Sequence, residues 1–440
     1  MANPRLRFFR VHLLGLASAA LLVASPALPA GFGFFEQGAK ATAMGGAFSA
    51  VADDPSAIFY NPSGLGFQDH FSVMAGTTVT TFTKSEFTGD NPFPGEGATG
   101  TYHKTWFFPS TLYIVAPITS NLKFGFGAFS PFGLSSRWKS AETWSGRFIS
   151  QNAAIKTFSL EPVLAFRATP TFSVAAGAEY RISNVTLERN VAGVNPFTES
   201  LVDVAHVKLK SDNAHAWGWN AGFLWKPVPM FSLGGSYRSH MKTDFEAKAH
   251  FTQRLTGTPF DGLVAAQLAA QLPDGLDPKA TTSVDAPAIG DIGIAYHCPN
   301  NTFTLSADAV WTEWSRFSSL AIDFPDGDAP AIPVRNTGWK NVWSYRVGVE
   351  QKFHAWAVRA GFVYDQSPQP DSDVGPVLPD SIRRGYCLGF GYNGDHFGVD
   401  LADMYLPFQN RSTNGKSSDG FNGSYKLTAN LVGVNIRLSF

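Results

Sequence analysis

Beyond residue 30 the chain lacks any long apolar run, although 44% of its 440 residues are hydrophobic. A helix that crosses a bilayer needs about 20 consecutive apolar residues. We therefore expect no helical membrane span after residue 30. The sequence also lacks the glycine-rich loop with its lysine that binds nucleotide phosphates, so we expect no nucleotide-driven activity.

Cysteine is nearly absent. The two cysteines, Cys298 and Cys387, form neither a Cys-x-x-Cys motif nor a Cys/His cluster, and we predict no metal and no cofactor. Cys298 lies in an expected turn and Cys387 in an expected strand. Two unpaired thiols are favoured, although an exported protein can also form a disulfide.

Charge is scarce and balanced. Charged residues make up 16% of the chain and the net charge is −1, which gives no electrostatic argument for a nucleic-acid partner. The ten histidines are scattered, and no Gly-x-Ser-x-Gly elbow is evident. We predict that the protein is not an enzyme.

An export signal is present. A basic stretch up to Arg10 precedes an apolar stretch from Val11 to Ala24, and small residues follow. This order is typical of a secretory signal peptide, to which we assign residues 1–30. Cleavage after Ala27 and cleavage after Ala30 both remain open.

The last strand alternates to the final residue, with apolar side chains at every second position: Val432, Val434, Ile436, Leu438 and Phe440. The same period of two recurs in about fourteen segments, and the connections between them alternate between short and long. An exported chain with these properties is typical of an outer-membrane β-barrel, with one face in lipid and one in the lumen. The sequence predicts an all-β fold over residues 69–440, an antiparallel transmembrane barrel of about 14 strands. We expect contact with outer-membrane lipid, and engagement of the barrel-assembly machinery through the strand that ends in Phe440.

The expected strands are approximately 71–83, 104–116, 122–131, 153–168, 172–188, 207–226, 231–250, 286–297, 303–322, 341–353, 355–366, 382–393, 397–409 and 425–440. In the fifth strand, the set from Phe172 to Ile182 is expected to face lipid, and the set from Ser173 to Ser183 the lumen. Charges collect on the lumen set, because an arginine or lysine facing mid-bilayer lipid costs about 2–4 kcal/mol.

Residues 31–68 differ from the rest, being rich in glycine and alanine without sustained alternation. Gly45 and Gly46 permit close backbone approach. Asp54, beside Asp53, is expected to cap a short helix, and Asn61-Pro62 to form a turn. We predict a compact hatch inside the lumen, in which six residues have structural and functional roles but do not bind ligand: Gly45, Gly46, Asp53, Asp54, Asn61 and Pro62. Asp53, Asp54 and Asn61 either hold the hatch in the lumen or take part in its movement.

Two segments carry a family resemblance. The first contains Gly45-Gly46-Ala47, Ala52-Asp53-Asp54 and Asn61-Pro62-Ser63-Gly64-Leu65; the second contains Ser130-Pro131-Phe132-Gly133-Leu134 and Trp144-Ser145-Gly146-Arg147-Phe148. The chain resembles the FadL-type outer-membrane transporters of long-chain fatty acids and other hydrophobic compounds, with Ser63 where alanine is usual. The resemblance implies a monomer that takes up a hydrophobic ligand passively, through an outer groove, an inner pocket and hatch rearrangement.

The resemblance also implies a lateral exit at an inward kink of the third strand. Gly125, Gly127, Pro131 and Gly133 supply a physical basis, because proline removes a ladder donor and glycine marks bends. The alternative is a strand that simply ends at Ser130.

A hydrophobic ligand needs a groove lined by hydrophobic side chains. The candidate lining residues are Phe132, Trp138, Trp144 and Phe148 of the third outer loop, and Leu263 and Leu268 of an expected helix at 260–272. That helix either lies over the lumen mouth or packs on neighbouring loops.

A carboxylate head group needs a cation, and the candidates are Arg147, Arg181, Arg316 and Arg346. The alternative is that these arginines pair with inward carboxylates such as Glu179, Asp308 and Glu350. If all of these arginines are neutralised in this way, a neutral aromatic or alkane hydrocarbon is a better substrate than a fatty acid. A general porin and an outer-membrane hydrolase are the remaining alternatives.

Overall fold

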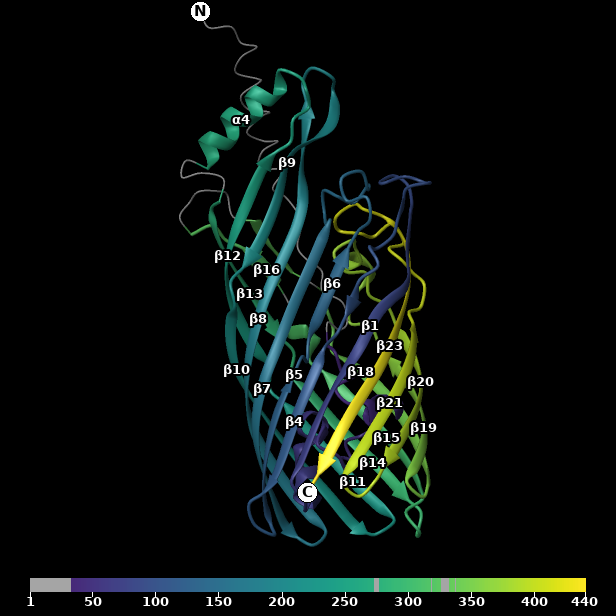
Figure 1. The fold of residues 1–440 in the computed structure, drawn as a ribbon. Coiled ribbons are helices and arrows are strands. Elements are labelled where there is room, and N and C mark those ends of the chain that lie inside the picture. The colour runs from purple at the N-terminus through teal and green to yellow at the C-terminus, as the bar shows by residue number, and fades with distance from the viewer. Residues whose placement is uncertain (1–32, 273–276, 318, 326–331, 337) are drawn as a thin grey trace, which may run out of the picture.

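The computed structural model describes residues 33–272, 277–317, 319–325, 332–336 and 338–440. Within these ranges the chain forms a tall antiparallel barrel of fourteen strands, several of them broken into two consecutive segments (Figure 1). The barrel closes where β1 (Ser72–Gly89) pairs with β23 (Gly423–Ser439), the first strand with the last. Both predicted cleavage sites lie outside the described residues.

In chain order the fourteen strands are β1; β3 (Trp106–Phe107) with β4 (Ser110–Pro117); β5 (Leu122–Phe129) with β6 (Gly133–Arg137); β7 (Asn152–Thr169); β8 (Phe172–Asn195); β9 (Ser200–Ser211) with β10 (Ala214–Val228); β11 (Phe231–Arg238) with β12 (Met241–Gln253); β13 (Lys279–Ala286) with β14 (Ile289–His297); β15 (Phe303–Thr312); β18 (Val342–Phe353); β19 (Trp356–Asp365); β20 (Arg383–Asn393); β21 (Phe397–Pro407); and β23.

Shorter elements lie in the long loops: β2 (Thr99–Gly100), α4 (Phe260–Gln271), η2 (Trp314–Arg316), β16 (Ser319–Ile322), β17 (Ile332–Asn336), η3 (Asp371–Asp373) and β22 (Arg411–Ser412). The ninth strand ends at Thr312 rather than at the expected 322, because β16 pairs with β17 in a separate small sheet. Among the described residues, no helix has both the length and the apolar character needed to cross a bilayer.

The faces of the wall follow the predicted alternation. On β8, Ser173, Glu179 and Arg181 are buried inside, whereas Val174 is 39% exposed on the outer face. The apolar outer positions run from Phe172 to Ile182, about 33 Å along the strand. With a tilt near 40°, this span matches the apolar band of about 25 Å expected of such barrels.

Above that band the alternation continues with reversed polarity. On β12 the inward residues Phe245, Ala247, Ala249 and Phe251 are buried, and the residues between them are charged or polar and exposed. The strands β8, β9 and β12 rise beyond the rest of the barrel, with α4 beside their tips (Figure 1). The upper part of the lumen is therefore lined by apolar side chains, which form a large buried cluster.

The third strand is interrupted between Phe129 and Gly133. Phe129 pairs with Ser159 of β7 and Gly133 pairs with Lys156, so four steps on one strand match three on the other. One extra residue is thus inserted, as in a β-bulge, and Pro131 supplies no ladder donor there. The second strand pairs with the third only as far as Ala128. In the described chain, backbone hydrogen bonding between them resumes where the N–H of His103 donates to the carbonyl of Arg137.

Residues 33–68, which we call the hatch, lie inside the lower part of the barrel (Figure 1, purple). They form the short helices α2 (Ala39–Ala43) and α3 (Ala57–Tyr60) and the 3-10 turn η1 (Pro62–Phe67). Hydrogen bonds from opposite parts of the wall hold them. Ser306 of β15 donates to the carbonyl of Ala47 (2.7 Å), and Asn435 of β23 accepts from the N–H of Ala39.

Glycines of the inner wall provide space for the hatch backbone. A Cβ at Gly348 would collide with the backbone of Met44, and one at Gly361 would collide with Gly45. Gly45 and Gly46 themselves have φ values of 66° and 73°, the left-handed conformation that favours glycine. The close backbone approach that the sequence predicts at Gly45 and Gly46 is therefore present.

Candidate functional site

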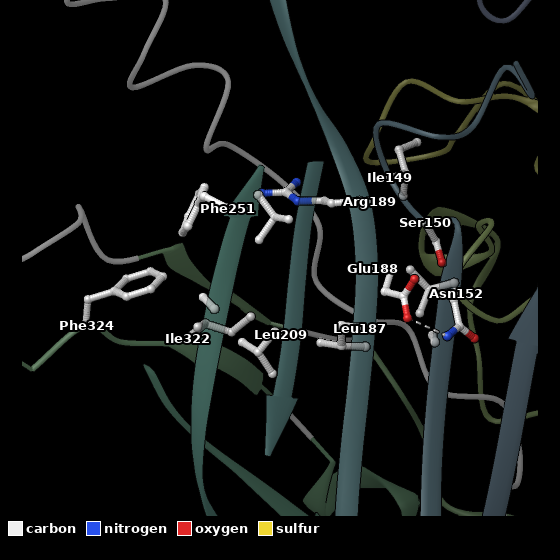
Figure 2. A pocket seen from close by; sticks show the side chains of 14 residues that line it. Ile149, Ser150, Asn152, Leu187, Glu188, Arg189, Leu209, Phe251, Ile322 and Phe324 are labelled. Atoms are coloured by element: carbon white, nitrogen blue, oxygen red, sulfur yellow. Dashed lines mark hydrogen bonds between the residues drawn. The ribbon is translucent and has the colours of Figure 1, made fainter. Parts of the chain in front are cut away.

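A mostly apolar recess, which we call the outer pocket, lies in the upper lumen, and its empty space of about 580 Å³ includes open solvent. Its wall comes from β7, β8, β9 and β12, and its far side from β16 and the segment after β19 (Figure 2). The apolar lining includes Leu187, Leu209, Phe251, Ile322 and Phe324. A recess with this mostly apolar lining suits a hydrophobic small molecule.

One guanidinium group enters this apolar lining. Arg189 extends from β8 across the neighbouring strand toward Phe251 (Figure 2). Among the described residues, no carboxylate lies within ion-pair distance of it, and Asp419 acts on it only at longer range. A half-buried cation among mostly apolar side chains can pair with an anionic group.

A second cavity of about 230 Å³, the middle pocket, lies lower on the same strands. Ala153 of β7 lines the outer pocket and Ile155, the next inward residue, lines the middle one. The middle pocket reaches Phe132 in the third-strand interruption, where the guanidinium of Arg181 lies 4.5 Å from the ring centroid. The inner wall therefore offers nearly continuous apolar contact from the outer pocket to the interruption.

A third cavity of about 430 Å³, the lower pocket, lies against the hatch. Phe35 and Tyr60 of the hatch line it, together with Asp291 and Arg346 of the wall. Arg346 is buried and stacks on the ring of Phe35 at 4.6 Å. Its Nε has no hydrogen-bond partner among the described groups.

The start of the hatch is attached to the third-strand interruption. Gly33 forms a β-bridge with Phe132, and the N–H of Phe34 donates to the carbonyl of Pro131 (2.7 Å). The side chain of Gln37 donates to the carbonyl of Ser130 (2.7 Å). The hatch thus covers the place where the second and third strands part.

The four predicted head-group arginines have different environments. Arg147 pairs with Asp203 (2.9 Å), Arg181 with Glu179 (2.7 Å) and Arg316 with Glu313 (2.6 Å). Arg346 forms no ion pair within 4 Å among the described carboxylates, although Asp291 lines the same lower pocket.

The six predicted groove residues do not come together. Trp138 and Trp144 stack at 3.9 Å inside a closed aromatic cluster with Phe87 and Phe421. Their indole N–H groups are used internally, on the carbonyls of Pro376 and Ser150. These two tryptophans line none of the three pockets, because loop packing buries both of their faces.

The other four lie apart from that cluster. Phe132 lines the middle pocket, and Leu268 of α4 packs against the large apolar cluster. Leu263 is 43% exposed, and Phe148 lies under the guanidinium of Arg147 (4.2 Å). The predicted helix is present at 260–271, and it buries Phe260 and Val264.

The four residues predicted to form the kink lie in two different places. Gly125 and Gly127 face the hatch, where an added Cβ would lie within 2.5 Å of Leu65 and 2.8 Å of Ile58, respectively. Only Pro131 and Gly133 lie at the interruption, and Gly133 has open space beside it. Gly125 and Gly127 therefore make room for the hatch rather than bend the strand.

The polar hatch residues mostly hold the hatch together. Asp53 pairs with Lys40 (2.8 Å), and Oδ1 of Asp54 accepts the N–H of Ser56 (2.8 Å) ahead of α3. Asn61 has a wider role, since its amide donates to the carbonyl of Phe223 on the barrel wall (2.9 Å). Pro62 opens η1.

Sequence reasoning missed Arg189 and the outer pocket around it. The signal was the reversed alternation in the seventh expected strand, 231–250, where Lys242, Asp244, Glu246 and Lys248 share one face. Four charges in a row cannot face lipid, so the apolar residues between them must face inward.

The comparisons with known proteins agree with this architecture. Residues 20–440 match the family model of the outer membrane protein transport proteins, OMPP1/FadL/TodX. The chain belongs to this family. It is 22% identical to the long-chain fatty acid transport protein of Escherichia coli strain K12, over 97% of this chain and 98% of that one. It is 23% identical to outer membrane protein P1 of Haemophilus influenzae, with the same coverage.

Solved structures of the family share the fold. A FadL homologue of Pseudomonas aeruginosa superimposes with a TM-score of 0.82 at 22% identity, covering 93% of this chain and all of that one. The toluene transporter TodX of P. putida gives 0.67 at 17% identity, covering 92% and 98%. This family member is accordingly an outer-membrane transporter of hydrophobic compounds, not an enzyme.

Proposed function

We propose that this FadL-family protein takes up long-chain fatty acids by passive diffusion. The observation that carries the substrate class is Arg189, a cation with no carboxylate within ion-pair distance among the described residues, in a pocket whose lining is mostly apolar. The carboxylate that also lines this pocket, Glu188, is held by Lys208 (3.1 Å) and Asn152 (3.2 Å). A neutral hydrocarbon would gain nothing from it, whereas a fatty acid can place its carboxylate there and its alkyl chain on Leu187 and Leu209.

The proposed path follows the three pockets. The ligand enters the outer pocket and moves down the apolar inner face to the middle pocket, beside Phe132. Release of residues 33–37 from Ser130–Phe132 then uncovers the unpaired stretch between the second and third strands. The apolar tail can leave there sideways into the bilayer, without crossing the hatch.

Uptake measurements test the substrate class. Cells that lack their own fatty-acid transporter and express this chain are given labelled oleate, labelled toluene or a labelled sugar. We expect a large gain in oleate uptake, little gain for toluene and none for the sugar. Equal gains for oleate and toluene would favour the hydrocarbon channel, and sugar entry would indicate a general porin.

A further inference from the structure

The sixth and seventh strands of the barrel part along the middle of their length. In the lower half β10 pairs with β11, and in the upper half β9 pairs with β12. Between these two ladders lie residues 214–218 of β10 and residues 241–246 of β12, all of them described, and no backbone pairing joins them. Each segment remains paired on its other side, β10 with β8 and β12 with β13. We call this unpaired stretch the split.

Backbone hydrogen bonds close the split at both ends. At its lower end the N–H of Ser239 donates to the carbonyl of Trp219 (2.9 Å), and at its upper end the N–H of Asp212 donates to the carbonyl of Glu246 (3.1 Å). An unpaired backbone group is costly in contact with lipid, and it is tolerated where it is buried in protein or lines a cavity. We therefore expect a cavity behind the split.

The middle pocket occupies that position. Thr243 and Phe245 of β12 line it on one side of the split. Arg181 and Ser183 of β8 line it on the other side, and both are paired with the open segment of β10. The inward residues of that segment are two alanines and a glycine, so they place little bulk between the pocket and the split.

The side chain of Met241 covers the split from the inside. It is 2% exposed, and a Cβ added to Gly218 would lie 2.7 Å from its Cγ and Sδ, so the methionine reaches across onto β10. The absence of a side chain at Gly218 provides the space that Met241 fills. Methionine is unbranched and has three rotatable bonds, so it can move aside while the backbone stays in place. A flexible side chain, and not a ladder of hydrogen bonds, therefore closes the wall here.

The outer rim of the split is aromatic on one strand and polar on the other. Trp217 and Trp219 of β10 are 70% and 53% exposed, and Trp217 is paired with Tyr180 in the upper part of the apolar band. On β12, Lys242 and Asp244 lie 3.5 Å apart, so their charges offset each other. Tryptophan is typical of the boundary between hydrocarbon and head groups. The split therefore opens at the upper edge of the apolar band, toward the outer leaflet.

We propose that the split is a second lateral opening, through which uncharged molecules with an apolar chain pass from the outer leaflet into the middle pocket. The chain enters between β10 and β12 when Met241 turns aside. A carboxylate gains nothing at the rim, because Asp244 offsets the charge of Lys242. This route goes beyond the proposed uptake of fatty acids, since it uses neither Arg189 nor the outer pocket. Its failure would leave that proposed function untouched.

The test uses the full chain in lipid vesicles, and the probe is a long-chain alkyl alcohol with a photoreactive diazirine at the end of its chain. Labelled residues are mapped by mass spectrometry after illumination. In the wild type we expect label on Thr243 and Phe245. Met241→Ala should raise this label several-fold, because the alanine no longer reaches across the split. Met404→Ala removes an equally buried methionine from the inner face of β21, and it should leave the label unchanged.

A second variant moves the covering side chain to the opposite strand. In Gly218→Leu/Met241→Ala the leucine takes the space that the methionine occupied, so the label on Phe245 should return to the wild-type level or below. Three outcomes would overturn the proposal. They are no label on Phe245 in either the wild type or Met241→Ala, an equal rise in Met404→Ala, which would show general loosening, and a parallel rise at Phe251, which would show entry from the outer pocket.

Discussion

Asp308 and Arg346 lie directly opposite each other on β15 and β18, yet they do not form an ion pair. Asp308 accepts the N–H groups of Phe48 and Ser49 of the hatch, both at 2.8 Å. Arg346 turns onto Phe35 at the start of the hatch. The hatch thus separates two wall charges that could pair with each other once it moves, which would offset part of the cost of moving it.

Removing the carboxylate of Asp308 should loosen the hatch. Asp308→Ala leaves two buried N–H groups without an acceptor, which costs about 1–3 kcal/mol each. We expect amides 44–52 to lose protection in hydrogen-exchange mass spectrometry. Asp308→Asn keeps an acceptor oxygen and serves as the matched control. Unchanged protection in the alanine variant would contradict this account of how the hatch is held.

Arg189 should distinguish acidic from neutral substrates. A charge-assisted hydrogen bond contributes about 1.5–3 kcal/mol, so Arg189→Gln should lower oleate affinity at least about tenfold. Oleyl alcohol has the same chain without the charge, and its binding should change less than twofold. Arg189→Lys should retain part of the oleate affinity. Equal losses for acid and alcohol would assign Arg189 a packing role only.

The sequence predicted the barrel wall better than its interior. Alternation from Phe172 to Ser183 gave both faces correctly, because a misplaced charge in lipid is costly. The alternation could not predict what the carboxylate of Asp308 contacts. The strand register places Arg346 directly opposite Asp308 and would suggest an ion pair between them. That choice depends on backbone N–H groups of a hatch more than 250 residues away in sequence, which no local pattern encodes.

Trp138 and Trp144 show a related limit. Aromatic residues in an outer loop suit a ligand groove and a packed loop core equally well by composition. Only the tertiary contacts with Phe87 and Phe421 decide for the packed core. Arg189 was missed because the expected fifth strand ended at residue 188, so no face of the wall was assigned to it.

A disulfide between the hatch and the third strand should block transport reversibly. Gly33 and Phe132 are bridge partners, and directly paired residues of antiparallel strands have Cα separations that a disulfide can span. We expect Gly33→Cys/Phe132→Cys, made with Cys298→Ser, to lose oleate uptake when oxidised and to regain it after reduction. Each single cysteine variant controls for the substitution itself. Full uptake by the oxidised double variant would exclude release of residues 33–37 as a step.

The seating of the hatch should depend on pH through Asp54. Burial, together with the neighbouring carboxylate of Asp53, raises the pKa of Asp54 to about 6. A carboxyl with a raised pKa stabilises the seated state fully below about pH 4, and this contribution is lost as the pH rises through 6. Hydrogen-exchange protection of the hatch, corrected for intrinsic rates, should therefore fall between pH 4 and 7. Asp54→Asn should flatten that profile, because its amide oxygen can still accept from Ser56.

The lateral exit can be tested at Gly133. A Cβ there meets no atom within 4 Å, so Gly133→Trp should fit without strain and change stability by less than about 0.5 kcal/mol. If the ligand leaves through the unpaired stretch beside it, the indole should obstruct the exit and lower oleate uptake several-fold. Binding of oleate to the purified protein should stay unchanged, because the outer pocket is distant on the inner face.

Gly127→Leu provides the contrast. Its side chain would collide with Ile58 of the hatch, and overpacking of this kind costs about 1–3 kcal/mol. It should therefore loosen the hatch, seen as faster hydrogen exchange at residues 57–60, whereas Gly133→Trp should not. Normal uptake by Gly133→Trp would argue against an exit at the third strand. A loss of uptake accompanied by loosening of the hatch would show that the tryptophan acts on the hatch instead of the opening.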